Sequence, residues 1–427
     1  MSYSAAELLK IAKRAEKLGE SFTAFDAYSD VLNNFPSNIT ALRRRFDLDL
    51  LRKREPTTKS KENLEYEEIN KKLELGVSDL MKLNLKEFIF DNPSATFAYP
   101  AYAKLCAKKE ILRFVTMLRC LLGNTQKSHH KYYLLQALFS CAKREGHFGN
   151  AFKYLKKAND IKRHYLKYDP ERDESNIKLI KNKFEEFWDT SIFRTPLIDQ
   201  KFIFIIGMPR SGTTLVEQTI CNAEGVASVG EVPFATQFMS QTNLKMDLKV
   251  ISQDLSSFYA AKIEKYRLSE NHIIDKMPFN LFWVGFLAIS FPNAQFVHCK
   301  RDARATCWSN YETSFAEGNQ FSYKLNEIVR HYNNCEDLML FWKSKFQDRI
   351  FTLDYDAFTE EPEIIGSSLF DFLQLSWKQE YLDGKRSDRP IKTASQLQVK
   401  KGIYRNSSQA WKNFEPFIGK AFQPLID

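Results

Sequence analysis

The sequence has few cysteines and histidines, and neither residue type is spaced as in a disulfide-rich or metal-binding protein. Its seven cysteines are an odd number and form no C-x-x-C pair, which argues against a disulfide framework and a zinc site. Among the seven histidines, His129 and His130 are adjacent, and neither has a partner at ligand spacing. We therefore expect a protein of a reducing compartment that requires no metal.

The sequence also lacks a long apolar segment and a visible secretory signal. Its longest apolar stretch, LFWVGFLAISF (281–291), is about half of the roughly 20 residues that a membrane helix needs. The N-terminal MSYSAAELLKIAKRAEK contains no basic segment followed by an apolar one. We expect a soluble, cytoplasmic protein with no membrane span.

The charge balance of the chain is basic but not extreme. Its 427 residues carry a net charge of +9, and 44% of them are hydrophobic, which allows two domains or one large domain with an appendage. A positive charge spread over so long a chain is more typical of a solvated face with one anion pocket than of a nucleic-acid surface. We expect no nucleic-acid partner.

The N-terminal half has helical apolar spacing. Residues 3–34 predict a helical hairpin, with a break at Gly19 and a stop at Pro36. One spacing of a small residue and larger apolar residues occurs twice, as Gly19, Ala24, Tyr28 and Val31 and again as Gly146, Ala151, Leu155 and Ala158. It resembles the tetratricopeptide repeat, whose hairpins stack on one another. Two copies are fewer than the three or so of a stable stack, so an ordinary helical bundle is the alternative.

From residue 201 the pattern changes to β-prone runs that alternate with helical stretches. The runs are FIFII (202–206), HIID (272–275), NAQFVHC (293–299) and RIFTLDY (349–355). This alternation predicts an α/β domain with a parallel, P-loop-like sheet and ligand chemistry at the carboxyl ends of its strands. We expect a helical domain over residues 1–195 and the α/β domain over residues 196–427.

The loop GMPRSGTT (207–214) lies between the first strand and a helix that begins near Thr213. Gly207 and Gly212 allow backbone amides to converge on an anion, and the helix N-terminus adds partial positive charge. Thr213 replaces the lysine of the Walker pattern, which disfavours a P-loop kinase or nucleotidase. Arg210 supplies a cation instead, and the loop suits a shorter group such as a 5′-phosphosulfate. A turn that binds no ligand is the alternative.

Two further stretches are basic. VHCKRDARATCWSNYE (297–312) places Arg301 at a strand end and Ser309 about two turns along the next helix, so that both can face one phosphate. KTASQLQVKKGIYRNSSQAWK (392–412) contains lysines and an arginine but no acid. The alternatives are a surface arginine with a buried serine, and a basic loop that binds nothing or contacts nucleic acid.

Together these motifs resemble sulfotransferases that use 3′-phosphoadenosine 5′-phosphosulfate (PAPS), in particular those with an N-terminal tetratricopeptide region and the protein-tyrosine sulfotransferases. The family's loop P-[RK]-S-G-T-T, which binds the 5′-phosphosulfate, is matched in full by Pro209, Arg210, Ser211, Gly212, Thr213 and Thr214. Arg301 and Ser309 match the pair that holds the 3′-phosphate. Ser395, Gln398 and Lys400 match a C-terminal loop that folds over the nucleotide.

The resemblance also implies catalytic roles. Glu231 in VGEVPF (229–234) matches the general base, and Lys276 in IIDKMPFN (273–280) matches the lysine that stabilises the bridging oxygen. Arg210 and Ser395 would share this charge stabilisation. Tyr355 matches a strand-end tyrosine near the nucleotide, and Asp275 either orients Lys276 or caps the following turn. The alternatives are a surface glutamate in a turn and a core tyrosine.

The sequence departs from the family pattern at Ala303, where many relatives have Pro, at Trp308, where Leu is usual, and at Thr313. Thr313 replaces an arginine that helps the tyrosine sulfotransferases to hold acidic peptides, which weakens the case for such an acceptor. We expect in-line transfer of sulfonate from PAPS to a hydroxyl of a small molecule, a glycan or a peptide, without an obligatory metal. The alternative function is a tetratricopeptide scaffold with an inactive sulfotransferase-like domain. A protein partner or a homodimer through the helical region is left open.

Overall fold

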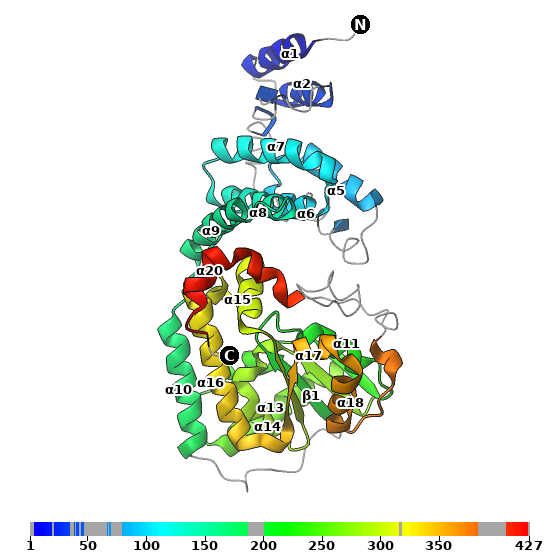
Figure 1. Cartoon of the computed structure of the whole chain (residues 1–427), viewed down its shortest axis with the longest axis vertical. Helices are drawn as coiled ribbons and strands as arrows, with labels where there is room; N and C mark the ends of the chain where they lie inside the picture. The colour runs from blue at the N-terminus through cyan, green and yellow to red at the C-terminus, as the bar shows by residue number, and fades with distance from the viewer. Residues whose placement is uncertain are drawn as a thin grey trace. The chain divides into compact units, whose positions relative to one another are not determined.

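The computed structural model describes residues 4–18, 21–34, 38, 40–41, 44–46, 66, 68–69, 79–186, 200–315, 318–382 and 407–425. The chain divides into two compact units, Met1–Leu166 and Lys167–Asp427, and Figure 1 shows the elements of each. No helix in these described ranges combines the length and the apolar character that crossing a membrane requires.

The first unit consists of helices in its described residues. They are α1 (Ala5–Lys17), α2 (Ser21–Asn34), α5 (Asp79–Asp91), α6 (Tyr99–Leu105), α7 (Ile111–Asn124), α8 (Ser128–Arg144) and α9 (Phe148–Tyr165), with the 3-10 turns η1 (Thr96–Ala98) and η2 (Lys108–Glu110). The first helix begins at a capping box, because the Ser4 hydroxyl accepts from the Glu7 amide and the Glu7 carboxylate accepts from the Ser4 amide.

Both predicted hairpins are present. The α1–α2 pair packs around residues that include Ala24, Tyr28 and Val31, all without exposed surface. The α8–α9 pair is joined through Gly146, whose φ of +76° lies in the left-handed region that favours glycine, and Ala151, Leu155 and Ala158 are equally buried. Small residues at these positions let paired helices approach closely. Gly19 lies outside the described residues, and the assignment to the tetratricopeptide repeat stays a prediction.

The second unit contains a five-stranded sheet in which every strand pair is parallel, as the sequence predicted. Its strands are β1 (Lys201–Gly207), β2 (Val226–Gly230), β3 (His272–Lys276), β4 (Gln295–Lys300) and β5 (Ile350–Asp354). Their order is β2-β3-β1-β4-β5, so β1 is central, with β2 and β3 on one side and β4 and β5 on the other. The carboxyl ends of all five strands therefore meet at one edge.

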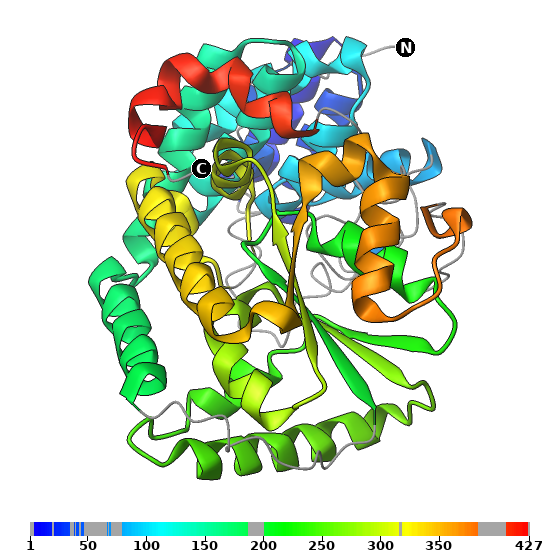
Figure 2. The same cartoon turned by 60° about the horizontal axis from the view of Figure 1, so that its bottom comes forward.

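Helices cover both faces of this sheet. The helices described in this unit are α10 (Pro170–Glu186), α11 (Thr213–Cys221), α12 (Phe234–Met239), α13 (Leu248–Ile263), α14 (Val284–Ser290), α15 (Ala303–Glu312), α16 (Leu325–Phe346), α17 (Tyr355–Glu360), α18 (Pro362–Leu373) and α20 (Glu415–Phe422). Short 3-10 segments connect them: η4 (Glu264–Tyr266), η5 (Pro278–Trp283), η6 (Gln320–Tyr323), η7 (Gln347–Arg349), η8 (Gln379–Leu382) and η9 (Ser407–Phe414). Figure 2 shows α16 in yellow and α18 in orange on opposite sides of the sheet.

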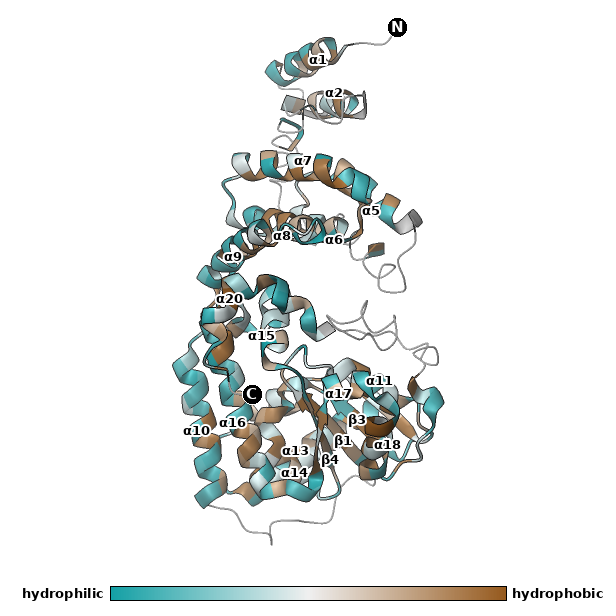
Figure 3. Cartoon of the chain, in the orientation of Figure 1, coloured by the Kyte–Doolittle hydropathy of each residue, from teal (hydrophilic) through white to brown (hydrophobic). Residues whose placement is uncertain are grey.

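The central strand β1 is apolar on both faces. Ile203 and Ile205 belong to the cluster that includes side chains of α11 and α18. Phe202 and Phe204 point to the other face, where their rings stack with centroids 5.4 Å apart and contact Phe291 after α14. A strand of a parallel sheet that is buried on both faces has a continuous apolar sequence. The run FIFII therefore predicted this strand. Figure 3 shows the strands mainly in the brown of hydrophobic residues.

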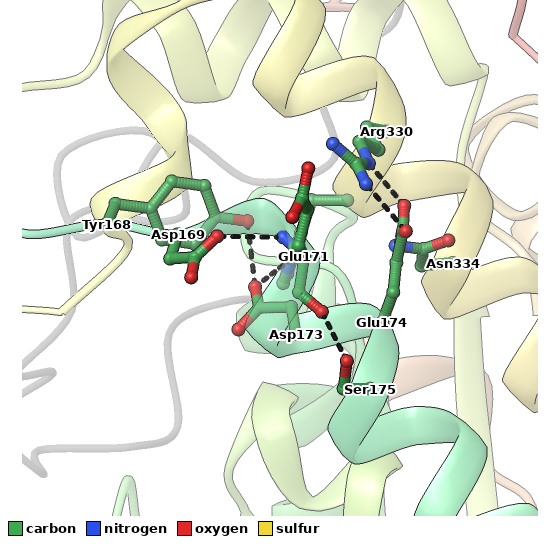
Figure 4. A network of polar contacts seen from close by, with 9 residues as sticks. Tyr168, Asp169, Glu171, Asp173, Glu174, Ser175, Arg330 and Asn334 are labelled. Carbon is green, nitrogen blue, oxygen red and sulfur yellow. Dashed lines mark hydrogen bonds and ion pairs between the residues drawn. The ribbon is translucent and has the colours of Figure 1, made fainter.

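Helix α10 belongs to the second unit, although it precedes the predicted domain boundary. It packs along α16, where Arg330 pairs with Glu174 (Figure 4). The Phe184 ring of α10 also lies 4.9 Å from the Trp342 ring of α16. These contacts explain why the compact unit begins at Lys167. Residues 187–199, around the predicted boundary, lie outside the described residues, so the domain limits 1–195 and 196–427 remain a prediction.

Candidate active site

Two glycines shape the loop between β1 and α11. Gly207 has a φ of +144°, and a Cβ there would lie 2.5 Å from the carbonyl oxygen of Cys299. Gly212 has a φ of +100°, and a Cβ there would lie 2.0 Å from the Tyr355 ring. Both positions therefore need glycine, because the backbone is left-handed and the neighbouring atoms are too close for a side chain.

Arg210, between these glycines, is also left-handed, with a φ of +71°. Non-glycine residues rarely adopt this conformation, and such strain is concentrated at functional sites. The Arg210 Nε donates to the Ser309 hydroxyl at 3.0 Å, and its carbonyl oxygen accepts from Nη1 of Arg301 at 3.1 Å. The Asn310 amide donates to the Pro209 carbonyl at 2.7 Å. Residues from β4 and α15 thus hold the loop in shape.

Arg301 follows the end of β4 and is fixed from two sides. Its Nε donates to the Ser408 hydroxyl at 2.8 Å, and that hydroxyl in turn donates to the Asp356 carboxylate. The guanidinium lies over the Tyr355 ring, 5.2 Å from its centre. Within the described part of the chain, Arg301 forms no ion pair with a carboxylate. Burial lowers the pKa of both Arg301 and Arg210, because removal from water disfavours a cation. A bound anion would offset that cost.

The structure brings together the predicted nucleotide-binding residues that it describes. Arg210, Arg301 and Ser309 meet at the loop, and Tyr355 lies against Gly212. The Ser211 hydroxyl is buried and has no hydrogen-bond partner among the described residues. The buried Thr213 and Thr214 begin α11. Two guanidinium groups, an unpartnered hydroxyl and a helix N-terminus fit a ligand with more than one anionic group.

Glu231 and Lys276 also come together, from the ends of two neighbouring strands. Lys276 is the last residue of β3 and is fully buried, and its Nζ donates to the carboxylate of Glu231, which directly follows β2. The Glu231 side chain is 37% exposed, so it faces solvent on one side. A second carboxylate, that of Glu217 on α11, lies 3.5 Å from the Lys276 Nζ and accepts from the Ser228 hydroxyl at 2.6 Å.

Asp275 points away from Lys276, because consecutive side chains of a strand alternate between faces. Its carboxylate accepts from the Tyr259 hydroxyl at 3.0 Å and from the Asn280 side-chain amide at 3.1 Å. It is fully buried, and this burial raises its pKa to about 8. Asp275 therefore braces the η5 turn through the Asn280 side chain, and within the described residues it forms no hydrogen bond or ion pair with Lys276.

Comparison with known proteins finds a family that resembles this part of the chain. The sequence pattern of the sulfotransferase family matches residues 203–379, which include the loop, Glu231, Lys276 and Arg301. This part of the chain is similar in sequence to the sulfotransferase family. Within the described residues of the two units, no group of three or more His, Cys, Asp or Glu side chains is placed to hold a metal ion.

Three proteins of known sequence are also similar to this chain. The chain is 30% identical over 301 residues to an uncharacterized protein of Aquifex aeolicus, covering 65% of this chain and 39% of that protein. It is 24% identical over 242 residues to a putative protein-tyrosine sulfotransferase of Caenorhabditis briggsae (53% and 86%). It is 26% identical over 207 residues to protein-tyrosine sulfotransferase 1 of Danio rerio (44% and 58%). The chain thus spans well under half the length of the Aquifex relative.

Solved structures of sulfotransferase domains also match. The domain from the Synechococcus PCC 7002 olefin synthase has a TM-score of 0.39 and 19% identity, and the match covers 52% of this chain and 90% of that one. The domain from the curacin biosynthetic pathway has a TM-score of 0.39 and 16% identity, with coverage of 54% and 100%.

Three of the predicted site residues, Ser395, Gln398 and Lys400, lie outside the described residues. Their stretch ends within the described part, where Ser408 reaches Arg301.

Sequence reasoning missed four residues that the fold adds to the site: Glu217, Asn310, Asp356 and Ser408. Only Glu217 had a usable signal, since it lies four residues after Thr213 and so on the same face of α11. The other three had no local signal, because each contacts a residue that lies more than 50 positions away in the sequence.

The departures from the family pattern have structural roles. Trp308 is buried and stacks on Phe414, with ring centroids 4.2 Å apart. Ala303 is buried at the start of α15. The Thr313 hydroxyl donates to the Ser309 carbonyl at 2.6 Å, at the end of the same helix. Trp308 and Thr313 thus support the helix that carries Ser309.

Proposed function

We propose that this protein is a PAPS-dependent sulfotransferase that transfers a sulfonate group to a hydroxyl acceptor. The family match of residues 203–379 and the relatives named protein-tyrosine sulfotransferases support a sulfotransferase enzyme. One observation carries the proposal: a cationic cluster and a carboxylate–lysine cluster lie at the same edge of one parallel sheet, on the two sides of β1. Ligands of open α/β sheets bind at this edge.

In the proposed complex the cationic cluster holds the donor. The loop amides, Arg210 and the Ser211 hydroxyl would bind the 5′-phosphosulfate, and Arg301 with Ser309 would bind the 3′-phosphate. The support is the burial that lowers the pKa of both guanidinium groups. The buried Ser211 hydroxyl just before α11, which has no hydrogen-bond partner among the described residues, supports it as well. Thr213, Thr214, Pro209, Gly212 and Tyr355 complete this site, and Ser395, Gln398 and Lys400 are proposed to cover the nucleotide.

The carboxylate–lysine cluster would carry out the chemistry. Glu231 accepts the proton of the acceptor hydroxyl, and Lys276 donates a hydrogen bond to the phosphate oxygen that the sulfuryl group leaves. Arg210 and Ser395 share this charge stabilisation. Sulfuryl transfer resembles phosphoryl transfer in its in-line path, so positioning and charge stabilisation supply most of the rate. The exposure of Glu231 supports its role, because an acceptor must reach it.

The acceptor is proposed at the level of a hydroxyl on a small molecule, a glycan or a peptide tyrosine. Thr313 donates within its own helix, which gives no cation at this position for an acidic peptide. We propose a cytoplasmic location and a tetratricopeptide-like first unit that binds a protein partner or a second copy. Light scattering of the full chain tests the second copy, and cell fractionation tests the location.

Calorimetric binding of 3′-phosphoadenosine 5′-phosphate (PAP) to the full chain is the test of the donor site, with ADP and ATP as controls. ADP shares the adenosine and two phosphates with PAP but lacks the 3′-phosphate. We expect PAP to bind roughly 10-fold or more tightly than ADP, since a charge-assisted contact contributes about 1.5–3 kcal/mol. Equal affinities would contradict the site. A stable protein complex without turnover would favour a scaffold.

A further inference from the structure

Lys276 is shared between two carboxylates from different elements. Its ammonium group is fully buried and donates to Glu231, and the Glu217 Oε2 lies 3.5 Å from the same nitrogen. Glu217 is the more buried of the two acids, with 14% of its side chain exposed against 37% for Glu231. One acid therefore faces the solvent side of the site, and the other lies behind the lysine.

Ser228 fixes this arrangement. Its hydroxyl donates to Glu217 at 2.6 Å and accepts from the Gly230 amide at 3.0 Å. The register of β2 against β3 shifts between Ser228 and Gly230, and Gly230 has a φ of +73°. Such an irregularity re-aims the following side chain, here Glu231. A single serine thus sets the positions of both acids relative to Lys276.

Glu217 leaves Lys276 with a charged partner when Glu231 becomes neutral. When Glu231 takes up a proton it loses its charge, and a lysine paired with it alone would become an unpaired buried cation. Breaking a buried pair in this way is strongly unfavourable, and the ammonium tends to lose its proton. The loss would come at the moment when the leaving phosphate oxygen needs a cation. Asp275 does not replace Glu217, because its hydrogen bonds go to Tyr259 and Asn280.

We propose that Glu217 is a positioning residue that keeps Lys276 charged and in place while Glu231 receives the proton of the acceptor. This inference rests on the proposed function. The acceptor O–H bond breaks and its proton goes to Glu231, while the acceptor oxygen bonds to sulfur. The bond from sulfur to the phosphate oxygen breaks, and its electron pair stays on that oxygen, to which Lys276 donates. The three side chains change from a net charge of −1 to 0, and the Lys276–Glu217 pair remains.

A double-mutant cycle tests this pairing without any turnover. Glu231→Gln imitates the protonated base, and Glu217→Gln removes the second charge. Each single variant of the full chain leaves Lys276 with one carboxylate, so each should lower the melting temperature only slightly. The double variant should lose roughly 5–10 °C beyond the sum of the two, because the buried ammonium is then unpaired.

Lys276→Met separates this effect from general damage. Added to the double variant, it should remove the extra loss and so raise the melting temperature again, even if the double variant alone does not fold. The inference would be overturned by additive losses in the cycle, or by an extra loss that remains after Lys276→Met is added.

Kinetics with PAPS and 4-nitrophenol as acceptor supply the second test. Glu217→Gln should lower kcat roughly 10- to 100-fold with the Kd for PAP unchanged, since a misplaced catalytic group costs about that much. Its pH–rate profile should move to lower pH, because removing a negative charge favours the ionised carboxylate and disfavours the ammonium. Glu217→Asp, which keeps the charge, should retain the wild-type profile.

Glu224→Gln is the matched control, because it removes the same charge from a side chain that is 91% exposed and pairs with Lys378. It should change neither kcat nor the profile. Wild-type kcat and profile in Glu217→Gln would overturn the inference. A wild type that neither binds PAP nor turns over would instead overturn the proposed function, while the unfolding cycle still decides whether Glu217 shares Lys276.

Discussion

The two halves of the site lie on the same sheet edge and have opposite chemistry. On the β4 side of the central strand, Arg210 and Arg301 each donate a hydrogen bond to a serine hydroxyl. On the β2 and β3 side, Glu217 and Glu231 surround one lysine. A parallel sheet supplies the same backbone geometry to both halves, so their side chains alone decide the function. The first half is suited to binding anions, and the second is suited to moving a proton.

This division has a physical reason. A carboxylate that pairs with a guanidinium group occupies the hydrogen-bond donors that an anionic ligand would use. A guanidinium paired with a carboxylate is correspondingly less available to an anionic ligand. Keeping Arg210 and Arg301 on the other side of β1 from Glu217 and Glu231 allows each pair to do its own task. The comparison therefore predicts that variants in one half leave the task of the other half intact.

The largest expected effect is on turnover, from Glu231→Gln. Removing a general base lowers kcat by about 10²- to 10⁴-fold, because the acceptor proton has no recipient. The PAP affinity measured by calorimetry should stay at the wild-type value, since the cationic half is unchanged. Glu224→Gln is the control for the loss of one charge. A parallel loss of PAP binding would show that the two halves do not act separately.

Arg301→Ala should have the next largest effect, and on binding. Loss of a charge-assisted contact of about 1.5–3 kcal/mol weakens PAP binding roughly 10- to 100-fold. The affinity for ADP should barely change, because ADP has no 3′-phosphate. Titration calorimetry of both nucleotides measures the difference. If PAP binds Arg301→Ala as tightly as the wild type, the assignment of the 3′-phosphate to this half is wrong.

Gly212→Ala should damage the loop that both halves share. A Cβ there would lie 2.0 Å from the Tyr355 ring, in addition to the strain of a φ of +100°. Gly225→Ala is the matched control, because its φ is +71° but nothing lies within 4 Å. Urea unfolding should give a loss of about 1–2 kcal/mol for the control and roughly 2 kcal/mol more for Gly212→Ala. Equal losses would mean that the ring adjusts freely.

The smallest expected effect is on the pH dependence of stability, and it comes from Asp275. This residue precedes Lys276 in β3 and points to the other face of the sheet. Burial raises its pKa from 3.8 to about 8, so the folded protein keeps this proton to a higher pH than the unfolded chain does. Its contribution to stability is therefore full below about pH 4 and is lost as the pH rises to about 8. The slope is at most about 1.4 kcal/mol per pH unit.

Asp275→Asn should remove this slope. Its oxygen still accepts from Tyr259, while its amide nitrogen takes the place of the oxygen that accepts from the Asn280 amide. The Asn280 amide then turns over, so that its oxygen, which has no hydrogen-bond partner among the described residues, accepts from the new side-chain amide of the variant. Urea unfolding from pH 5 to pH 8 should show the difference between wild type and variant growing with pH. Parallel stability curves would contradict a protonated Asp275.

The sequence was sufficient for the features that depend on local order. The apolar run FIFII predicted the central strand, and the four β-prone runs predicted a parallel α/β sheet, because a buried strand needs apolar side chains on both faces. The spacing around Gly146 predicted a helical hairpin that is present. The motifs led to Arg301, Ser309, Glu231 and Lys276, which the structure brings together in two clusters.

What only the tertiary structure decided is the contact between residues far apart in the sequence. Arg301 and Ser408 are 107 residues apart, and Lys276 and Glu231 are 45 apart. The start of the second compact unit at α10 likewise depends on contacts with α16, 156 residues away. The sequence by itself determined the strands, the glycine-dependent loop and the residue types of the site. The strand order and the direction of each side chain decided that Lys276 pairs with Glu217 and Glu231, while Asp275 contacts Tyr259 and Asn280 instead. No local pattern encodes which segments become neighbours.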